Sequence, residues 1–141
     1  MNQLRLARIF LAEDNPNDLE ITRRALKRGR LGCELIVARD GEEALEMLER
    51  PEVQPHIVLL DINLPKVSGL EVLEKIRRHQ CCMALPVIML SASNRNKDVR
   101  RSYELGANSY IQKPVVFEDF VDALELLYRY WFELARLPRP L

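Results

Sequence analysis

The sequence has few cysteines, no excess of either charge and no long apolar run. Its 141 residues include three cysteines, Cys33, Cys81 and Cys82. An odd number with two adjacent residues gives neither a disulfide framework nor the ligand spacing of a zinc site, so we expect a reducing, cytoplasmic location. The 21 basic and 21 acidic side chains balance, which gives no reason to expect binding to nucleic acid or to an anionic membrane surface.

No apolar stretch is long enough to cross a bilayer. The amino-terminal residues 1–11 lack the apolar core and the small-residue cleavage site of a signal peptide. Hydrophobic residues make up 48% of the chain, which at this length is enough for one substantial core with little room for a second. We therefore expect residues 1–141 to form a single domain without an output domain.

Short apolar runs alternate with helical patterns along the chain. Helices are expected to begin near Asn15 or Asn17, at Asp40, near Leu70 and at Asn96, and a long last helix should span about residues 116–137. The strand at 57–60 is uninterruptedly apolar, which suits a parallel strand covered on both faces. The alternation predicts an α/β fold with a doubly wound parallel sheet. The five expected strands are residues 7–12, 34–38, 57–60, 86–90 and 109–111.

Polar side chains stand at the ends of four of these strands. Glu13 and Asp14 follow the first, Asp61 the third, Ser91 the fourth and Lys113 the fifth. Ligands of open α/β sheets bind at the carboxyl ends of the strands. Carboxylates there can hold Mg²⁺ and one can accept a phosphoryl group, while a hydroxyl and an ammonium contact phosphoryl oxygens. The cluster predicts a switch that is itself phosphorylated.

Each of these residues alone has a simpler interpretation. Asp61 could be a solvated loop residue or a helix cap, and Glu13 and Asp14 could merely favour the following helix N-terminus. A serine after a strand is often a cap, and a lone lysine is usually solvated. The matching strand ends favour a shared site, and a bound cation would relieve the repulsion among the carboxylates.

The same residues resemble the receiver domain of bacterial response regulators, over nearly the whole chain. Ser91 lies thirty residues after Asp61 and Lys113 fifty-two after it, spacings similar to those of chemotaxis-type receivers. The resemblance implies a flavodoxin-like sheet with strand order 2-1-3-4-5 and five helices. The motifs that carry it are Glu13-Asp14, Asp61-Ile62-Asn63-Leu64-Pro65, Ser91-Ala92 and Gly106-Ala107 leading to Tyr110-Ile111-Gln112-Lys113-Pro114.

The resemblance also implies an acceptor and a metal site. Asp61 would take a phosphoryl group from the histidine of a sensor kinase. Mg²⁺ would be held by Asp14, Asp61 and the main-chain carbonyl of Asn63, with Glu13 acting through water. Glu13 departs from the aspartate of many receivers but keeps the carboxylate.

Phosphoryl contacts and a switch are implied as well. Lys113 would pair with the phosphoryl group, and a cis peptide bond would join it to Pro114. Ser91, a threonine in many receivers, would swing toward the phosphoryl group while Tyr110 rotates inward. These movements would shift an equilibrium in the face formed by the last two helices and the fifth strand.

The last helix carries more apolar surface than one core-facing stripe needs. Its aromatic end, with Tyr128, Trp131 and Phe132, predicts a homodimer interface, since aromatic residues are enriched in interfaces. The alternative is a helix that wraps its own domain. The tail resembles the single-domain regulators that serve phytochrome-type histidine kinases.

Three other functions compete with that of a signalling receiver. Haloacid-dehalogenase-like phosphatases also use a strand-end aspartate, but they need a second aspartate where this chain has Asn63, which cannot exchange protons. We therefore expect phosphorylation from small donors and autodephosphorylation, not turnover of phosphate esters. A phosphate sink or relay intermediate, and a pseudo-receiver that only binds partners, remain open.

Overall fold

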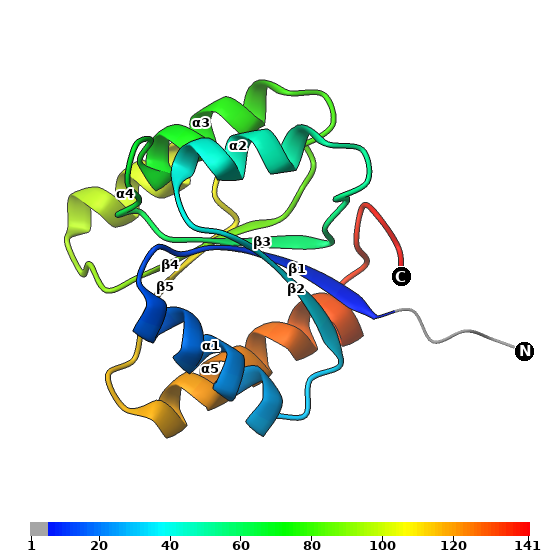
Figure 1. The fold of residues 1–141 in the computed structure, drawn as a ribbon, viewed down its shortest axis with the longest axis vertical. Helices are drawn as coiled ribbons and strands as arrows, with labels where there is room; N and C mark the ends of the chain where they lie inside the picture. Colours follow the sequence, from blue (N-terminus) through cyan, green and yellow to red (C-terminus); the bar gives the residue numbers. More distant parts are fainter. Residues whose placement is uncertain (1–5) are drawn as a thin grey trace, which may run out of the picture.

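The computed structural model of the chain describes residues 6–141, so residues 1–5 of the expected domain lie outside the described part. Five strands alternate with five helices, and a short π-helix, η1, follows the last of them (Figure 1). The strands are β1 (Ala7–Ala12), β2 (Cys33–Ala38), β3 (Ile57–Leu60), β4 (Val87–Ser91) and β5 (Ser109–Gln112). The helices are α1 (Pro16–Arg28), α2 (Gly41–Glu49), α3 (Gly69–Arg78), α4 (Asn96–Glu104), α5 (Phe117–Arg129) and η1 (Tyr130–Leu134).

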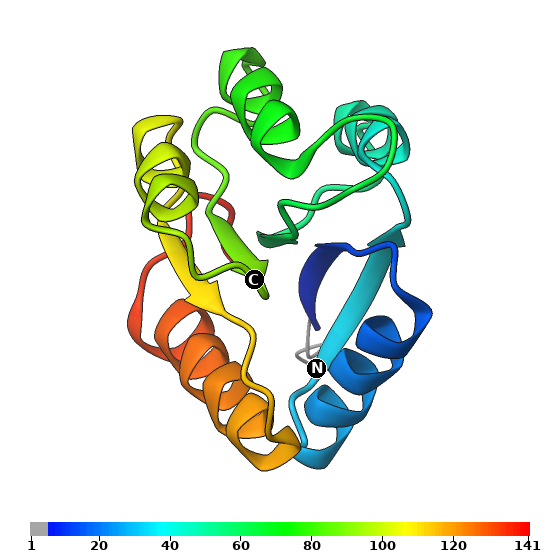
Figure 2. The same ribbon diagram turned by 90° about the vertical axis from the view of Figure 1, so that its left-hand side faces the viewer.

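The strands form one parallel sheet in the order β2-β1-β3-β4-β5. This confirms the predicted doubly wound fold and its strand order. Helices α1 and α5 cover one face of the sheet, while α2, α3 and α4 cover the other (Figures 1 and 2). The strand order reverses between β1 and β3, and such a switch point is where ligands of open α/β sheets bind.

The core lies in two layers because successive side chains of a strand point to opposite faces. In β1, Ile9 and Leu11 pack with α1 and α5, while Phe10 and Ala12 pack with α2 and α3. All four residues of β3 are buried, which explains its uninterrupted apolar run. The carboxyl ends of the central strands are therefore held rigidly between two packed layers.

Helix α1 begins where the capping pattern predicts. The Asn15 side chain accepts hydrogen bonds from the backbone N–H groups of Asn17 (2.8 Å) and Asp18 (3.2 Å), and Pro16 occupies the first turn. The cap leaves only three residues between β1 and the helix. The acidic pair that follows β1 is thus fixed close to the sheet edge.

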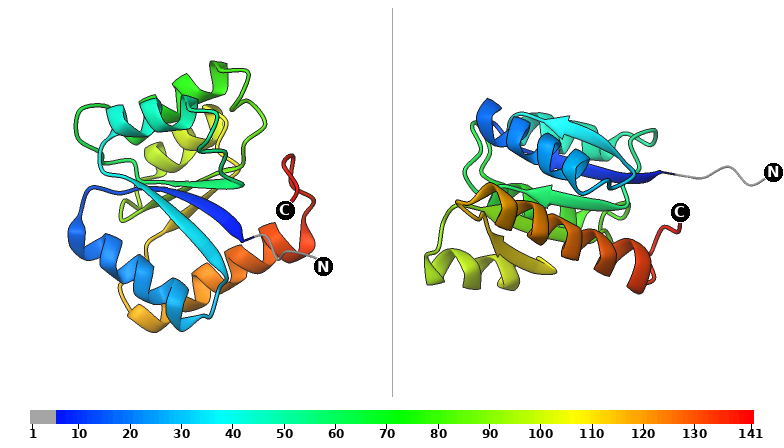
Figure 3. Two further views of the ribbon diagram at one scale, coloured as in Figure 1. Left: turned by 45° about the vertical axis from the view of Figure 1, so that its right-hand side comes forward. Right: turned by 90° about the horizontal axis from the view of Figure 1, so that it is seen from below.

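The last helix ends earlier than predicted. The α-helix stops at Arg129, and the π-helix that follows stops at Leu134, three residues before the expected end at 137. The Ala135 N–H donates to the Tyr130 carbonyl (2.7 Å), and Ala135 itself is extended. This turn lets Leu137 pack against the core on the α1/α5 face, and the chain then turns back toward the start of β1 (Figure 3).

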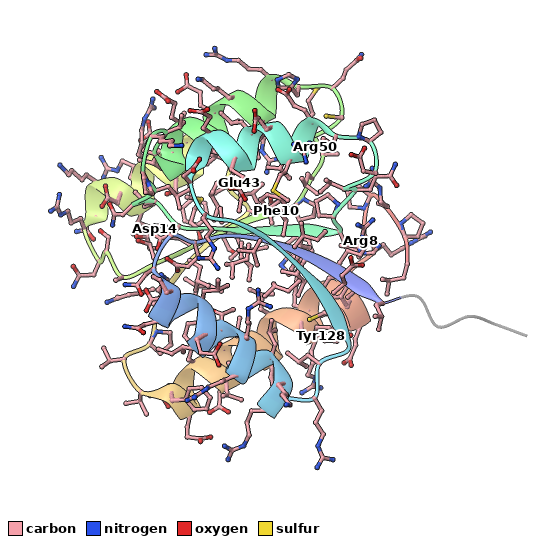
Figure 4. The ribbon with its side chains drawn as sticks, in the orientation of Figure 1. Arg8, Phe10, Asp14, Glu43, Arg50 and Tyr128 are labelled. Atoms are coloured by element: carbon pink, nitrogen blue, oxygen red, sulfur yellow. The ribbon has the colours of Figure 1, made fainter. Side chains whose placement is uncertain are left out.

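The aromatic end of this helix packs largely on its own domain. The Tyr128 hydroxyl donates to the Gly32 carbonyl (3.1 Å), and the ring of Phe132 meets Tyr128 and the edge of His56. Trp131 is also partly buried against the same core. Tyr128 is half-buried and lies beside β2 (Figure 4). Within residues 6–141, no helix is both long enough and apolar enough to cross a membrane.

Candidate functional site

The carboxyl ends of β1, β3, β4 and β5 carry the candidate site. Backbone hydrogen bonds continue just past the strands: the Asp61 N–H donates to the Ala12 carbonyl (3.2 Å) and the Lys113 N–H to the Ser91 carbonyl (2.8 Å). These bonds align the first residue after each strand with its neighbour. Glu13, Asp61 and Lys113, far apart in the sequence, therefore meet at one edge of the sheet.

Lys113 lies at the centre of the cluster. Its ammonium donates to a carboxylate oxygen of Glu13, to Asp61 Oδ2 (2.8 Å) and to Asp18 Oδ2 (3.1 Å). Burial disfavours its charged form, but the hydrogen bonds to Asp61 and Glu13 outweigh that effect and raise the pKa of Lys113. The lysine is therefore a permanent cation held beside Asp61.

Glu13 is the most buried carboxylate of the site, at 2% exposure. Burial raises the pKa of Glu13, while the hydrogen bond and the charge of Lys113 oppose the shift. The Asn15 N–H also donates to its second oxygen (3.3 Å). The charged form of Glu13 thus depends on the nearby cation.

Asp61 is 7% exposed, and each of its carboxylate oxygens has one protein donor. Oδ1 accepts from the Asn63 N–H (3.0 Å) and Oδ2 from Lys113. The backbone at Gly69, the first residue of α3, packs directly against the backbone of Asp61. A methyl group on Gly69 would lie 1.9 Å from the Asp61 carbonyl oxygen. Two hydrogen bonds and a close backbone contact therefore hold the Asp61 carboxylate in place.

Ser91 and Tyr110 are joined through Ser93. Ser91 is fully buried, and its hydroxyl accepts from the Ser93 N–H (3.3 Å). The Tyr110 hydroxyl donates to the Ser93 carbonyl (2.7 Å), and the Ser93 hydroxyl donates to Asp98 of α4 (2.6 Å). No described hydrogen bond joins the Ser91 side chain to Asp61 or Lys113. A movement of Ser91 would nevertheless reach β5 and α4 through one residue.

Asp14 and Asn63 are both exposed, at the outer side of the cluster. Asp14 lies at the turn where β1 leaves the sheet (Figure 4). Within residues 6–141, no three His, Cys, Asp or Glu side chains form a ready-made metal cage. Magnesium and similar hard cations need only one or two carboxylates and keep several waters, so two of the carboxylates of Glu13, Asp14 and Asp61 are enough for such an ion without a cage.

Asp18 is a part of the cluster that the sequence analysis missed. It lies in the first turn of α1, where an acidic residue is explained by the helix dipole alone. Its carboxylate nevertheless pairs with the Lys113 ammonium. The only feature of the sequence that points to Asp18 is its position four residues after Asp14.

The expected cis peptide bond between Lys113 and Pro114 is wrong for this structure. The described residues contain no cis peptide bond. The trans form of an X–Pro bond is favoured by about 0.5–1 kcal/mol. With this bond trans, Lys113 still pairs with Ser91 through its backbone and reaches Asp61 with its ammonium.

Comparison with known proteins places the chain in a family. Residues 9–125 match the response regulator receiver domain. The response regulator Rcp1 of Synechocystis is 34% identical over 135 residues, which cover 92% of this chain and 92% of Rcp1.

Solved structures agree with this match. The phosphorylated cyanobacterial phytochrome response regulator RcpA superposes with a TM-score of 0.89 at 33% identity, covering 96% of this chain and all of RcpA. The bacteriophytochrome response regulator AtBRR is 42% identical, with a TM-score of 0.74 and coverage of 96% of this chain and 100% of AtBRR. The fold, the clustered strand-end residues and these relatives agree, and the chain belongs to the response regulator receiver domain family.

Proposed function

We propose that Asp61 is the residue of this receiver that accepts a phosphoryl group from the phosphohistidine of a sensor kinase. The main support is the position of Lys113, whose ammonium donates to Asp61 Oδ2 at 2.8 Å while also bound to buried Glu13. A cation held there is already beside the oxygen that an incoming phosphoryl group would meet. Phosphorylation on an aspartate is general for the family.

In the transfer step, a carboxylate oxygen of Asp61 bonds to phosphorus as the phosphorus–nitrogen bond of the phosphohistidine breaks. The electron pair of that bond stays with the imidazole nitrogen. Lys113 shifts its hydrogen bonds from the carboxylates to phosphoryl oxygens. Asn63 supplies only an amide where a haloacid-dehalogenase-like phosphatase has its second aspartate, so this side chain cannot act as the general acid or base of ester hydrolysis.

A divalent cation is part of the proposal, and Mg²⁺ is the ion we expect. Asp14, Asp61 and the Asn63 carbonyl would hold it, with Glu13 acting through water, and when bound it would neutralise charge on the transferring group. The Rcp1 relative has been solved in an Mn²⁺-bound form, and the oxygen-rich donor set of this chain suits a hard ion.

Metal dependence tests the proposal. Wild-type protein treated with acetyl phosphate and Mg²⁺ should gain one labile phosphoryl group in intact-mass measurements, and a chelator should reduce the gain to background. Mn²⁺ in place of Mg²⁺ should restore it. Equal labelling in chelator would remove the metal from the mechanism.

The proposed switch starts at Ser91. If the Ser91 hydroxyl turns to donate to the phosphoryl group, the hydrogen bond that it accepts from the Ser93 N–H is broken. Ser93 is bound to both Tyr110 and Asp98, so its displacement is expected to alter the face formed by α4, β5 and α5. Phosphorylation would thereby shift the population of a partner-binding surface.

The proposed donor is a phytochrome-type histidine kinase in the cytoplasm. RcpA and AtBRR are both described as phytochrome response regulators, and they cover nearly the full length of this chain. The three cysteines are free, which agrees with a reducing compartment. A purified kinase core of this type should transfer its phosphoryl group to the protein faster than a kinase of another class.

We also propose homodimerisation through the last helix, but through its outer side. Leu126, Tyr130 and Leu134 are 67%, 51% and 77% exposed and follow one another at intervals of four residues. Arg129 and Glu133 flank this stripe and pair with each other at 3.5 Å. In a two-fold symmetric dimer the apolar stripe of one copy would pack on the same stripe of the other. Arg129 of each copy could then pair with Glu133 of its partner, as an isologous interface requires.

Leu134→Glu should convert the dimer to a monomer in sedimentation at micromolar concentrations, because it places a charge in the apolar stripe. Val115→Glu is the matched control, since Val115 is fully exposed before the other end of α5, and it should leave the dimer intact. A monomeric wild type, with or without phosphorylation, would contradict this proposal.

A further inference from the structure

The turn between α3 and β4 holds two adjacent thiols in contact. The Sγ atoms of Cys81 and Cys82 are 3.2 Å apart. This turn precedes the amino end of β4, whereas Asp61 follows the carboxyl end of β3. We propose that Cys81 and Cys82 form an oxidisable dithiol that a small hydroperoxide closes to a disulfide. The proposal does not depend on phosphorylation of Asp61.

The two thiols differ in access. Cys81 is exposed, whereas Cys82 is 2% exposed and its Sγ lies 3.7 Å from the Leu48 carbonyl. Burial and the contact with Cys81 raise the pKa of Cys82 to about 12, so Cys82 is a poor first target for a dissolved oxidant. Both thiols line a cavity of about 230 Å³ with Arg50, which lies just after α2 (Figure 4). A dissolved oxidant therefore meets Cys81 first.

The backbone of the turn is fixed by Arg77. Its guanidinium donates to the carbonyls of Cys82 (3.1 Å), Met83 (3.2 Å) and Leu85 (2.6 Å), and also to the Gly106 carbonyl (2.9 and 2.8 Å). These bonds tie the backbone of the turn from Cys82 onward to α3, while the Sγ atom of Cys81 lies in contact with that of Cys82. The second thiol is thus in place before the first is oxidised.

The chemistry needs two steps. A hydroperoxide transfers one oxygen to the Cys81 thiol, giving a sulfenic acid and releasing an alcohol, or water when the oxidant is hydrogen peroxide. The Cys82 sulfur then bonds to the Cys81 sulfur, the sulfur–oxygen bond breaks, and water leaves with the thiol proton of Cys82. The dithiol loses two electrons and two protons, and the hydroperoxide is reduced.

The product should be easily reduced. Bridged cysteines usually have Cα atoms 4.4–6.8 Å apart, whereas neighbouring Cα atoms are held at about 3.8 Å across a trans peptide. The ring is therefore strained, and strained disulfides have more oxidising potentials. Cys33 cannot compete, because it belongs to β2 and packs on the opposite face of the sheet from Cys82. The pair fits a reversible modification.

The test is the mass of the protein after brief treatment with a few equivalents of hydrogen peroxide. Most chains should lose the mass of two hydrogen atoms, and alkylation after unfolding should fall from three thiols to one, at Cys33. Dithiothreitol should restore all three. Cys33→Ser should still lose two hydrogens, whereas Cys81→Ser, which changes an exposed side chain, should lose none.

Three results would overturn the proposal. One is sulfinic acid at Cys81 while Cys82 remains open to alkylation. Another is a disulfide between two chains, seen as a dimer on a non-reducing gel that is absent for Cys81→Ser. The third is a chain with all three thiols unchanged at peroxide levels that oxidise a free cysteine peptide.

Discussion

Asp61→Asn should reduce labelling by acetyl phosphate to background. The amide has nearly the same shape and can still accept from the Asn63 N–H as the carboxylate does, but it lacks the charge and nucleophilic oxygen that attack phosphorus. The expected loss is at least a hundredfold in labelling rate, in line with removal of a covalent nucleophile. Intact mass measured over time with saturating Mg²⁺ gives this rate.

Asp119→Asn is the matched control. Asp119 lies in the first turn of α5, is exposed and has no part in the cluster, so its replacement should leave labelling unchanged. The fold of the Asp61 variant should be checked by urea unfolding, which should still show a single cooperative transition. If the Asp61 variant still took up a labile phosphoryl group at the wild-type rate, another side chain would be the acceptor.

Gly69→Ala should lower the free energy of unfolding by about 3 kcal/mol, as overpacking of a rigid contact does. The added methyl group would lie 1.9 Å from the Asp61 carbonyl oxygen and 2.8 Å from the Ile62 Cα. Both are backbone atoms, so the loop between β3 and α3 has to move. Because Asp61 stands on that loop, the labelling rate should fall together with the stability.

Gly32→Ala is the control for this prediction. A methyl group at Gly32 meets only a Leu6 side-chain carbon at 3.8 Å, so the change in stability should stay within about 0.5 kcal/mol. Urea unfolding of both variants measures the difference. Equal midpoints for the two alanine variants would mean that the loop at Asp61 is looser than described.

The sheet could be predicted from the sequence because its strands are buried on both sides. A run such as residues 57–60 has to be apolar throughout when helices cover both faces. The same topology explains why the clustering of the site residues could be predicted, since the carboxyl ends of parallel strands lie at the same end of the sheet. Glu13, Asp61 and Lys113 lie together for this reason.

The remaining features depend on tertiary contacts that no local pattern records. The sequence does not single out Asp18, because a helix N-terminus already explains an acidic residue at that position. The last helix was expected to reach residue 137, yet packing of Phe132 and Leu137 closes it at Leu134 with a π-turn. The same packing turns Tyr128 and Phe132 toward their own domain and leaves Leu126, Tyr130 and Leu134 exposed on the outer side.

The most direct test of the central claim is to locate the phosphoryl group in wild-type protein. Reduction with borohydride converts an aspartyl phosphate to homoserine, and peptide sequencing by mass spectrometry then identifies the position. The account predicts homoserine at position 61 alone, and only in samples treated with acetyl phosphate and Mg²⁺. Homoserine at position 14 or 18, or at no position in a sample that carries the label, would contradict it.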